Sequence, residues 1–259
     1  MRVVSLHPDV LLATSSIWQT NCVIVRSGEE TFAIDSPVLP EELEVLPSLL
    51  EQSRFPAPSG LLATHADWDH LLGRLAFPDA ALGCAVTSAE RMRSTPGAAQ
   101  RELRAFDEEH YVQRPRPLAL GSVQELDVPG ECEIGDHELA LHPAEGHTID
   151  GMAISIGWAA TLVVGDYLST VEIPMLGEGG SVDAYLATLE RLRPLLSAAE
   201  HVVPGHGPVL DSKRATAVLE EDLSYLCALR DRGVADLPDG RRTGAQRRIH
   251  SENVSRVGG

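Results

Sequence analysis

Residues Thr64–Gly73 read Thr-His-Ala-Asp-Trp-Asp-His-Leu-Leu-Gly and directly follow the short apolar run Gly60–Ala63. An apolar run of this length predicts a buried β-strand. Within the six residues after Thr64 the chain then places four side chains of types that bind metals: His65, Asp67, Asp69 and His70. Four such polar side chains at the mouth of a strand are hard to explain by packing, so they predict a metal site.

Strand and helix patterns alternate on both sides of this stretch. Residues with strand-like patterns are Val10–Ala13, Asn21–Arg26, Thr31–Ile34, Gly60–Ala63, Leu82–Val86, Val123–Leu126, Glu131–Ile134, Glu138–Leu141, Met152–Ile156, Thr161–Val164 and His201–Val203. Apolar residues at helical spacing predict helices at Glu41–Gln52, Leu71–Leu75, Ser181–Leu196 and Ser212–Arg232. This alternation indicates an α/β protein in which two strand-rich halves form two packed sheets. Ligands of such sheets gather at the carboxyl ends of strands.

Two segments have less definite patterns. Ser88–Tyr111 is rich in Arg and Glu, which predicts one or two solvated helices broken near Pro96 and Gly97, with a substrate cap as the alternative. Arg241–Gly259 mixes arginine with polar residues and predicts a frayed basic tail, with a docking segment as the alternative. We expect residues 1–211 to form a catalytic domain, and residues 212–259 to add a helix and tail packed on it.

Composition limits the class of protein. The 259 residues are 43% hydrophobic, enough for a sizeable core, and carry a formal net charge of −17, which disfavours a nucleic-acid partner. The start has no signal-peptide pattern, and no stretch approaches the ~20 apolar residues of a membrane span. We therefore expect a cytoplasmic protein with no membrane partner. The four cysteines are scattered without a CxxC pair, which favours buried, reduced thiols.

Three further short motifs fall where later strands are expected to end: Glu145-Gly146-His147-Thr148, Val164-Gly165-Asp166-Tyr167 and Pro204-Gly205-His206-Gly207-Pro208. Each offers one more ligand next to a glycine, which permits a tight turn and a close backbone approach. The four motifs together supply four His and three Asp, enough for two metal ions with a shared carboxylate. Two cations ~3.5–4 Å apart activate a water molecule and polarise the carbonyl or phosphoryl oxygen that it attacks.

In this order the motifs resemble the pattern of the metallo-β-lactamase superfamily, Thr-His-x-His-x-Asp-His followed by Gly-His-Thr, Gly-Asp and Gly-His-Gly. The resemblance covers about Val10 to Leu210 and implies a four-layer αββα sandwich of two mixed β-sheets flanked by helices. It implies a hydrolase whose metal-bound hydroxide attacks an ester, thioester or lactone bond of a small molecule, with Asp69 orienting the nucleophile and relaying its proton. The implied ligands are His65, Asp67 and His147 for the first metal, Asp69, His70 and His206 for the second, and Asp166 between the two.

Asp67 stands where the family usually has its second histidine. A carboxylate still binds zinc but is a harder ligand, so two Zn²⁺ ions are expected, with a shifted preference towards iron or manganese. A third carboxylate also lowers the positive charge of the site. Our hypothesis is a weaker Lewis acid, whose water has a higher pKa and which suits substrates with good leaving groups. Tyr167 and Trp68 flank ligands and could line a substrate pocket, with packing as the alternative for both.

Other functions of the same fold remain open from the sequence. His65, His147 and Asp166 could form the triad of a mononuclear iron oxygenase acting on a thiol or persulfide. A phosphodiesterase or a ligand-binding domain without catalysis is a further alternative. One iron per chain would favour the oxygenase, and two zinc ions the hydrolase. No motif identifies the substrate or the oligomeric state.

Overall fold

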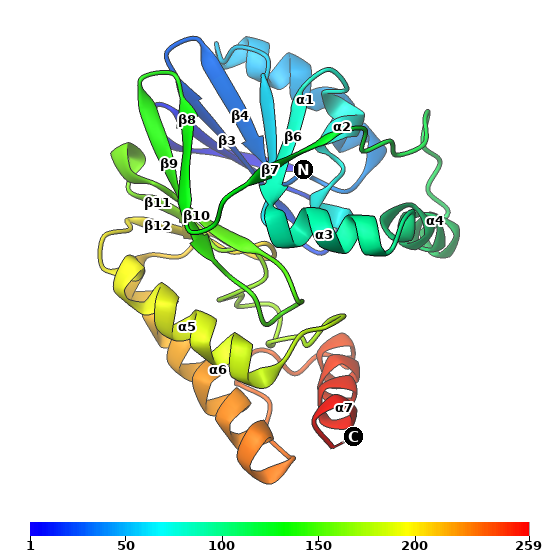
Figure 1. Ribbon diagram of the computed structural model, residues 1–259, viewed down its shortest axis with the longest axis vertical. Helices are drawn as coiled ribbons and strands as arrows, with labels where there is room; N and C mark the ends of the chain where they lie inside the picture. The colour runs from blue at the N-terminus through cyan, green and yellow to red at the C-terminus, as the bar shows by residue number, and fades with distance from the viewer. Residues whose placement is uncertain (259) are drawn as a thin grey trace.

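The alternating runs in the first half of the chain fold into the larger of two β-sheets (Figure 1). This computed structural model describes residues 1–258, and its larger sheet contains seven strands in chain order. The first four strands pair antiparallel and the last four pair parallel. The strands are β1 (Arg2–His7), β2 (Val10–Thr14), β3 (Asn21–Ser27), β4 (Glu30–Ile34), β5 (Gly60–Ala63), β6 (Ala81–Ala85) and β7 (Val123–Leu126).

The smaller sheet has five strands in the order β12-β11-β10-β9-β8. Strands β8 to β11 pair antiparallel, whereas β11 and β12 are parallel. Apolar side chains from both sheets, such as Ile34 on β4 and Ile154 on β10, share one core cluster between the sheets. The strands are β8 (Gly130–Ile134), β9 (His137–Pro143), β10 (Met152–Ile156), β11 (Thr161–Val163) and β12 (His201–Val203).

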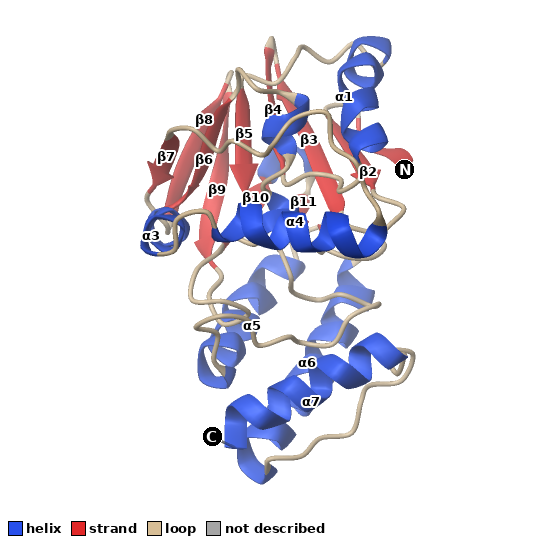
Figure 2. Ribbon diagram, turned by 90° about the vertical axis from the view of Figure 1, so that its right-hand side faces the viewer, coloured by secondary structure: helices blue, strands red, loops and turns tan. Residues whose placement is uncertain are grey.

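Helices cover the outer faces of both sheets, which completes the predicted αββα sandwich (Figures 1 and 2). On the side of the larger sheet lie α1 (Pro40–Gln52), α2 (Gly73–Ala76), α3 (Val86–Ser94) and α4 (Ala98–His110). On the side of the smaller sheet lie α5 (Val182–Leu196) and α6 (Ser212–Arg232), followed by α7 (Gly244–Gly258). Two 3₁₀ turns, η1 (Trp68–His70) and η2 (Gly157–Ala159), complete the fold. Among the described residues, none of the helices is long and apolar enough to cross a membrane.

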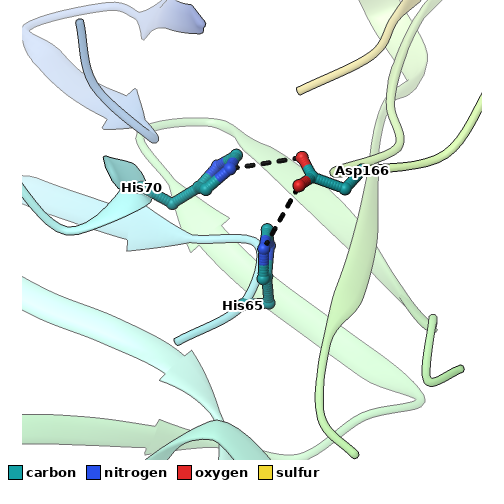
Figure 3. Close-up of side chains that lie close together, drawn as sticks. All are labelled: His65, His70 and Asp166. Carbon is teal, nitrogen blue, oxygen red and sulfur yellow. Dashed lines mark ion pairs between the residues drawn. The ribbon is translucent and has the colours of Figure 1, made fainter. Parts of the chain in front are cut away.

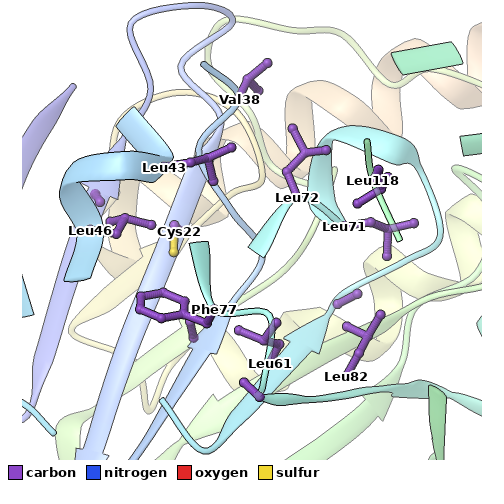
Figure 4. Close-up of a cluster of buried hydrophobic side chains, with 14 of the residues drawn as sticks. Cys22, Val38, Leu43, Leu46, Leu61, Leu71, Leu72, Phe77, Leu82 and Leu118 are labelled. Atoms are coloured by element: carbon purple, nitrogen blue, oxygen red, sulfur yellow. The ribbon is translucent and has the colours of Figure 1, made fainter. Parts of the chain in front are cut away.

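The cluster under α1 shows how the sequence pattern produces this layering (Figure 4). Leu43, Leu46 and Leu50 recur at helical spacing and are each at most 3% exposed. They belong to the same cluster as Cys22 on β3 and Leu61 on β5. Burying each leucine stabilises the fold by roughly 1.5–3 kcal/mol, so this face of α1 fixes the helix on the sheet.

Two expectations for the less regular segments need correction. The segment expected to form one or two solvated helices broken near residues 96 and 97 does fold as two helices, α3 and α4, with the break at residues 95–97. It is not wholly solvated, because α4 buries Leu103 and Phe106. Residue Arg91 of α3 points inwards and reaches the centre described below. Most of the segment expected to fray folds as α7, with Gln246 and Asn253 buried, and its last residue, 259, lies outside the described residues. Polar contacts to the backbone of another segment help to hold α7, together with three partly buried apolar side chains that pack against the core beside α5 and α6. Apolar periodicity does not reveal the polar contacts.

Candidate metal centre

The seven candidate ligands meet at one edge of the sandwich, where strands of both sheets end. Four come from the larger sheet, directly after β5 or in η1: His65, Asp67, Asp69 and His70. Three come from the smaller sheet, after β9, β11 and β12: His147, Asp166 and His206. The close approach requires glycine at Gly205, because a Cβ there would lie 2.1 Å from Oδ1 of Asp166. The glycine next to His206 therefore serves the close packing expected from its motif.

The first set of donors surrounds Oδ2 of Asp67. This oxygen lies 3.6 Å from Nε2 of His65 and 3.3 Å from Nε2 of His147. The three donor atoms fall within 4.8 Å of one another, close enough to share one metal ion. A carboxylate therefore fills the place that the family pattern gives to an imidazole.

The second set has nearly the same shape. Oδ2 of Asp69 lies 3.7 Å from Nε2 of His70 and 3.4 Å from Nε2 of His206. These three donors also lie within 4.8 Å of one another. The two sets thus match: each has one carboxylate oxygen and two imidazole nitrogens.

Asp166 lies between the two sets and turns one oxygen to each (Figure 3). Its Oδ2 lies 3.7 Å from His65 and 3.4 Å from His147. Its Oδ1 lies 3.2 Å from His70 and 3.5 Å from His206. This is the arrangement of a carboxylate that bridges two cations.

All four histidines turn Nε2 to the centre, and behind the centre each Nδ1 atom lies close to an oxygen atom. Nδ1 of His147 donates to the carbonyl of Met175 at 2.9 Å, and Nδ1 of His206 faces the carbonyl of Trp18 at 3.2 Å. A carbonyl accepts but does not donate, so these bonds place the proton on Nδ1 and leave Nε2 free to bind a metal.

Asp35 supports the other two imidazoles. Its Oδ2 lies 3.0 Å from Nδ1 of His70 and accepts the hydroxyl proton of Thr64 at 2.9 Å. The Thr64 oxygen in turn lies 3.1 Å from Nδ1 of His65. One buried carboxylate thereby orients a histidine of each set.

Two carboxylates of the centre, Asp67 and Asp166, are held in their ionised form. Burial alone would raise their pKa values, but the imidazoles around them outweigh burial. His206 and His70 hold the pKa of Asp166 well below its usual range, and His65 does the same for Asp67. Ionised carboxylates are the form that binds metals.

The pKa values of His70, His147 and His206 move in the opposite direction. Burial alone would lower their pKa values, but neighbouring carboxylates reverse this effect. The bond to Asp67 raises the pKa of His147 to about 9, and Asp166 raises the pKa of His206 to about 10. Without a metal, protons therefore supply the positive charge that the cluster of carboxylates requires.

The donor set fits divalent metal ions. Nε2 of His65, Nε2 of His70 and Oδ1 of Asp166 are buried and have no hydrogen-bond partner. An unsatisfied buried polar group costs about 1–3 kcal/mol, so three of them facing one point are explained by a cation that accepts their lone pairs. Imidazole and carboxylate together suit zinc, iron or manganese.

The two aromatic residues considered for the substrate pocket are both buried. The Tyr167 hydroxyl donates to the carbonyl of Ala144 at 3.1 Å and accepts the backbone N–H of His147 at 3.0 Å. Trp68 is 9% exposed and packs against Phe106. The structure thus places Tyr167 behind a ligand and Trp68 in the core beneath α4.

The structure adds residues that the sequence analysis did not identify. Arg91 contacts Asp67 at 2.7 Å, and no sequence signal separates it from the other arginines of its segment. Trp18 is 43% exposed, and its backbone carbonyl is the one that faces Nδ1 of His206. Trp18 and Gln19 have positive φ angles of 54° and 53°. A hollow of about 710 Å³ between α1, α2 and residues 113–116 is lined by none of the seven candidate ligands.

Fold and site together define an αββα protein whose clusters of His and Asp are compatible with divalent metal ions. A family model described as the metallo-beta-lactamase superfamily matches residues 16–206, which include all seven ligands. The chain belongs to the metallo-beta-lactamase superfamily, which consists broadly of metal-dependent hydrolases. No curated protein matches the chain.

Solved structures share the fold at low sequence identity. A metallo-beta-lactamase family protein from Thermus thermophilus is 19% identical, with a TM-score of 0.67 over 87% of this chain and 83% of its own. TTHA1623 in a di-iron-bound form is 23% identical, with a TM-score of 0.61 over 80% and 97%. A metallo-beta-lactamase from Pontibacter korlensis is 18% identical, with a TM-score of 0.60 over 85% and 98%.

Proposed function

We propose that this protein is a hydrolase that uses two divalent metal ions, Zn²⁺ before iron or manganese, to cleave an ester, thioester or lactone bond of a small molecule. The observation that carries the proposal is the position of Asp166, whose two oxygens face two separate pairs of imidazoles. Each pair has its own further carboxylate oxygen, from Asp67 or Asp69. A site for a single ion would not need this second, matching set.

The proposed ligands are His65, Asp67 and His147 for one ion, Asp69, His70 and His206 for the other, and Asp166 for both. When bound, two such ions lower the pKa of a water molecule and polarise the carbonyl oxygen that is attacked. In this proposal residues 1–211 carry the catalytic machinery, and residues 212–259 pack on them.

The chain's own residues have distinct roles in this proposal. Asp69 would orient the attacking water and relay its proton, since its carboxylate belongs to the second set of donors, where it faces His70 and His206. Trp18 and Ile149 are large apolar side chains, 43% and 58% exposed, on the segments that support His206 and carry His147. They would contact the apolar part of a small substrate. The net charge of −17 supports a small molecule over a nucleic acid.

Metal content and a substrate panel test the proposal together. We expect elemental analysis of the purified full chain to find two zinc ions per chain, and we expect hydrolysis of an ester, thioester or lactone. We expect the Asp166→Asn variant to bind less metal and to lose more than about 100-fold in activity. This loss exceeds the about 10–100-fold effect that is typical when a residue supporting a metal ligand is changed. One iron per chain with oxygen consumption would identify an oxygenase instead. Hydrolysis of a phosphodiester alone would refute the proposed bond class.

A further inference from the structure

Arg91 joins two carboxylates beside the first set of donors. Its NH2 lies 2.7 Å from Oδ1 of Asp67, and its NH1 donates to Oδ1 of Asp150 at 2.9 Å. The Arg91 side chain is 12% exposed, so water and salt screen these ion pairs less than they screen surface pairs. The planar guanidinium is suited to joining two carboxylates, because its fork of N–H groups reaches two acceptors at once.

Asp150 holds Arg91 in place and ties the two ligand turns together. The Asp150 side chain is fully buried. Its Oδ2 accepts the N–H of Ala66, which lies between two ligands, and its Oδ1 accepts the hydroxyl of Thr148, which follows His147. Arg91 is therefore fixed against the same backbone that positions the first set of donors.

The geometry points to Arg91 as the positioning residue that makes a carboxylate usable as a metal ligand at position 67. Arg91 occupies Oδ1 of Asp67, and Oδ2 faces His65 and His147. Asp67 thus presents a single oxygen, as an imidazole would present a single nitrogen. This inference rests on the proposed function, because it concerns the metal site of that hydrolase.

Arg91 also makes the charge of the site less negative than the ligand types alone predict. A carboxylate in place of an imidazole adds one negative charge to the ligand set. The guanidinium beside Asp67 offsets part of that charge, because Asp150 shares it. The site is therefore a stronger Lewis acid than the count of three carboxylates indicates. The contact of Arg91 with residue 67 is needed only while that residue is acidic, whereas its contact with Asp150 is not affected by residue 67.

A double-mutant cycle on metal affinity tests this dependence. Zn²⁺ affinities of the purified full chain are measured by competition with a chromophoric chelator. We expect Arg91→Met to weaken one of the two Zn²⁺ ions about 10–100-fold and to leave the other unchanged. In the Asp67→His background the same change should weaken Zn²⁺ binding much less, because a neutral imidazole needs no cation beside it and only the effect through Asp150 remains. Arg91→Lys keeps the charge without the fork, and should give an intermediate loss.

Arg93→Met is the matched control. Arg93 lies on the same helix, but its side chain is 57% exposed and pairs with Glu125 on the surface. We expect this variant to bind Zn²⁺ as the unchanged protein does. Equal affinities for Arg91→Met and Arg93→Met would overturn the inference, as would the same loss from Arg91→Met in both backgrounds. If Arg91→Met does not fold, Arg91→Lys replaces it with the same criteria. Failure of the unchanged protein to bind Zn²⁺ would instead overturn the proposed function.

Discussion

Tyr167 acts on the centre from behind a ligand. Its buried hydroxyl connects the carbonyl of Ala144 with the backbone N–H of His147. We expect Tyr167→Phe to leave that N–H without a partner and to lower the free energy of unfolding by about 1–3 kcal/mol. Urea unfolding of the metal-free protein measures the change. Tyr111→Phe is the matched control, because Tyr111 is 94% exposed. Equal stabilities of the two variants would contradict this role of the hydroxyl.

At the level of residues, the candidate ligands could be predicted from the sequence, but the residues that hold those ligands in place could not. Each proposed ligand stands in a short motif, often next to a glycine that permits close approach, so local sequence identifies it. Arg91 differs from Arg93 only in what it meets in space, and its partner Asp150 is 59 residues away. Asp35 is likewise recognised only through its contact with His70. Such residues depend on tertiary contacts that no local pattern encodes.

The first turn of α1 connects that helix to the segment between β2 and β3. The buried carboxylate of Glu42 accepts the hydroxyls of Ser15 and Ser16, both at 2.5 Å. Burial alone would raise the pKa of Glu42, but these hydrogen bonds outweigh it and lower the pKa below 4.5. A lowered pKa in the folded state means that the carboxylate stabilises the protein fully above pH 4.5, and that this contribution is lost as the pH falls through the folded value.

Glu42→Gln tests that contribution. We expect the variant to be about 1.5–3 kcal/mol less stable than the unchanged protein at pH 7, since its hydrogen bonds no longer involve a charged acceptor. The difference should shrink as the pH falls below 4.5. Urea unfolding at several pH values measures both effects. Glu44→Gln, an exposed change on the same helix, should show neither. A difference that stays constant with pH would contradict the assignment to the carboxylate.

Helix α7 holds a loop that borders the centre. Asn253 is fully buried, and its side chain accepts the N–H of Leu176 and donates to the carbonyl of Pro174. Between these two residues lies Met175, whose carbonyl orients His147. We expect Asn253→Ala to cost about 1–3 kcal/mol and to speed amide hydrogen exchange in residues 170–177. Ser255→Ala, an exposed change on α7, is the control. Unchanged exchange in the loop would contradict this role of α7.

The same helix shows which elements a sequence pattern can predict. The apolar spacing of α1, α5 and α6 predicted these helices because each buries an apolar face on a sheet or on another helix. Helix α7 is anchored by polar groups on a loop backbone, with Gln246 and Asn253 buried. Strand β1 was not predicted, and none of its residues is fully buried. Burial alone does not decide the outcome, because β7, which also has no fully buried residue, was predicted from its strand-like pattern.

At the scale of the whole molecule, the centre is a junction between the two sheets. The start of β3 reaches the turn after β12, where the Asn21 side chain donates to the carbonyls of Pro204 and Gly207, both at 2.8 Å. The ligands cross the same junction, four from one sheet and three from the other. Local patterns do not encode the strand order that creates this junction, so its prediction depended on the order of the four motifs. Metal ions at this point would tie the two halves of the sandwich together.

Metal binding should therefore stabilise the whole fold, and more so as the pH rises. A ligand at about 100 times its Kd adds about 2.7 kcal/mol per site. In the metal-free protein, protonated His147 and His206, with pKa values of about 9 and about 10, hold the carboxylates together. Because these pKa values lie above the ordinary 6.5, the stabilisation by the two protonated histidines is complete below pH 6.5 and is lost as the pH rises through 9 to 10.

The gap in Tm between zinc-loaded and chelator-treated protein should widen from pH 6.5 to 9, and thermal scans across that range measure it. We expect His206→Gln to weaken the pH dependence of the stability of the metal-free protein. A gap in Tm that does not change with pH would contradict the inference that protons and metal ions neutralise the same carboxylates.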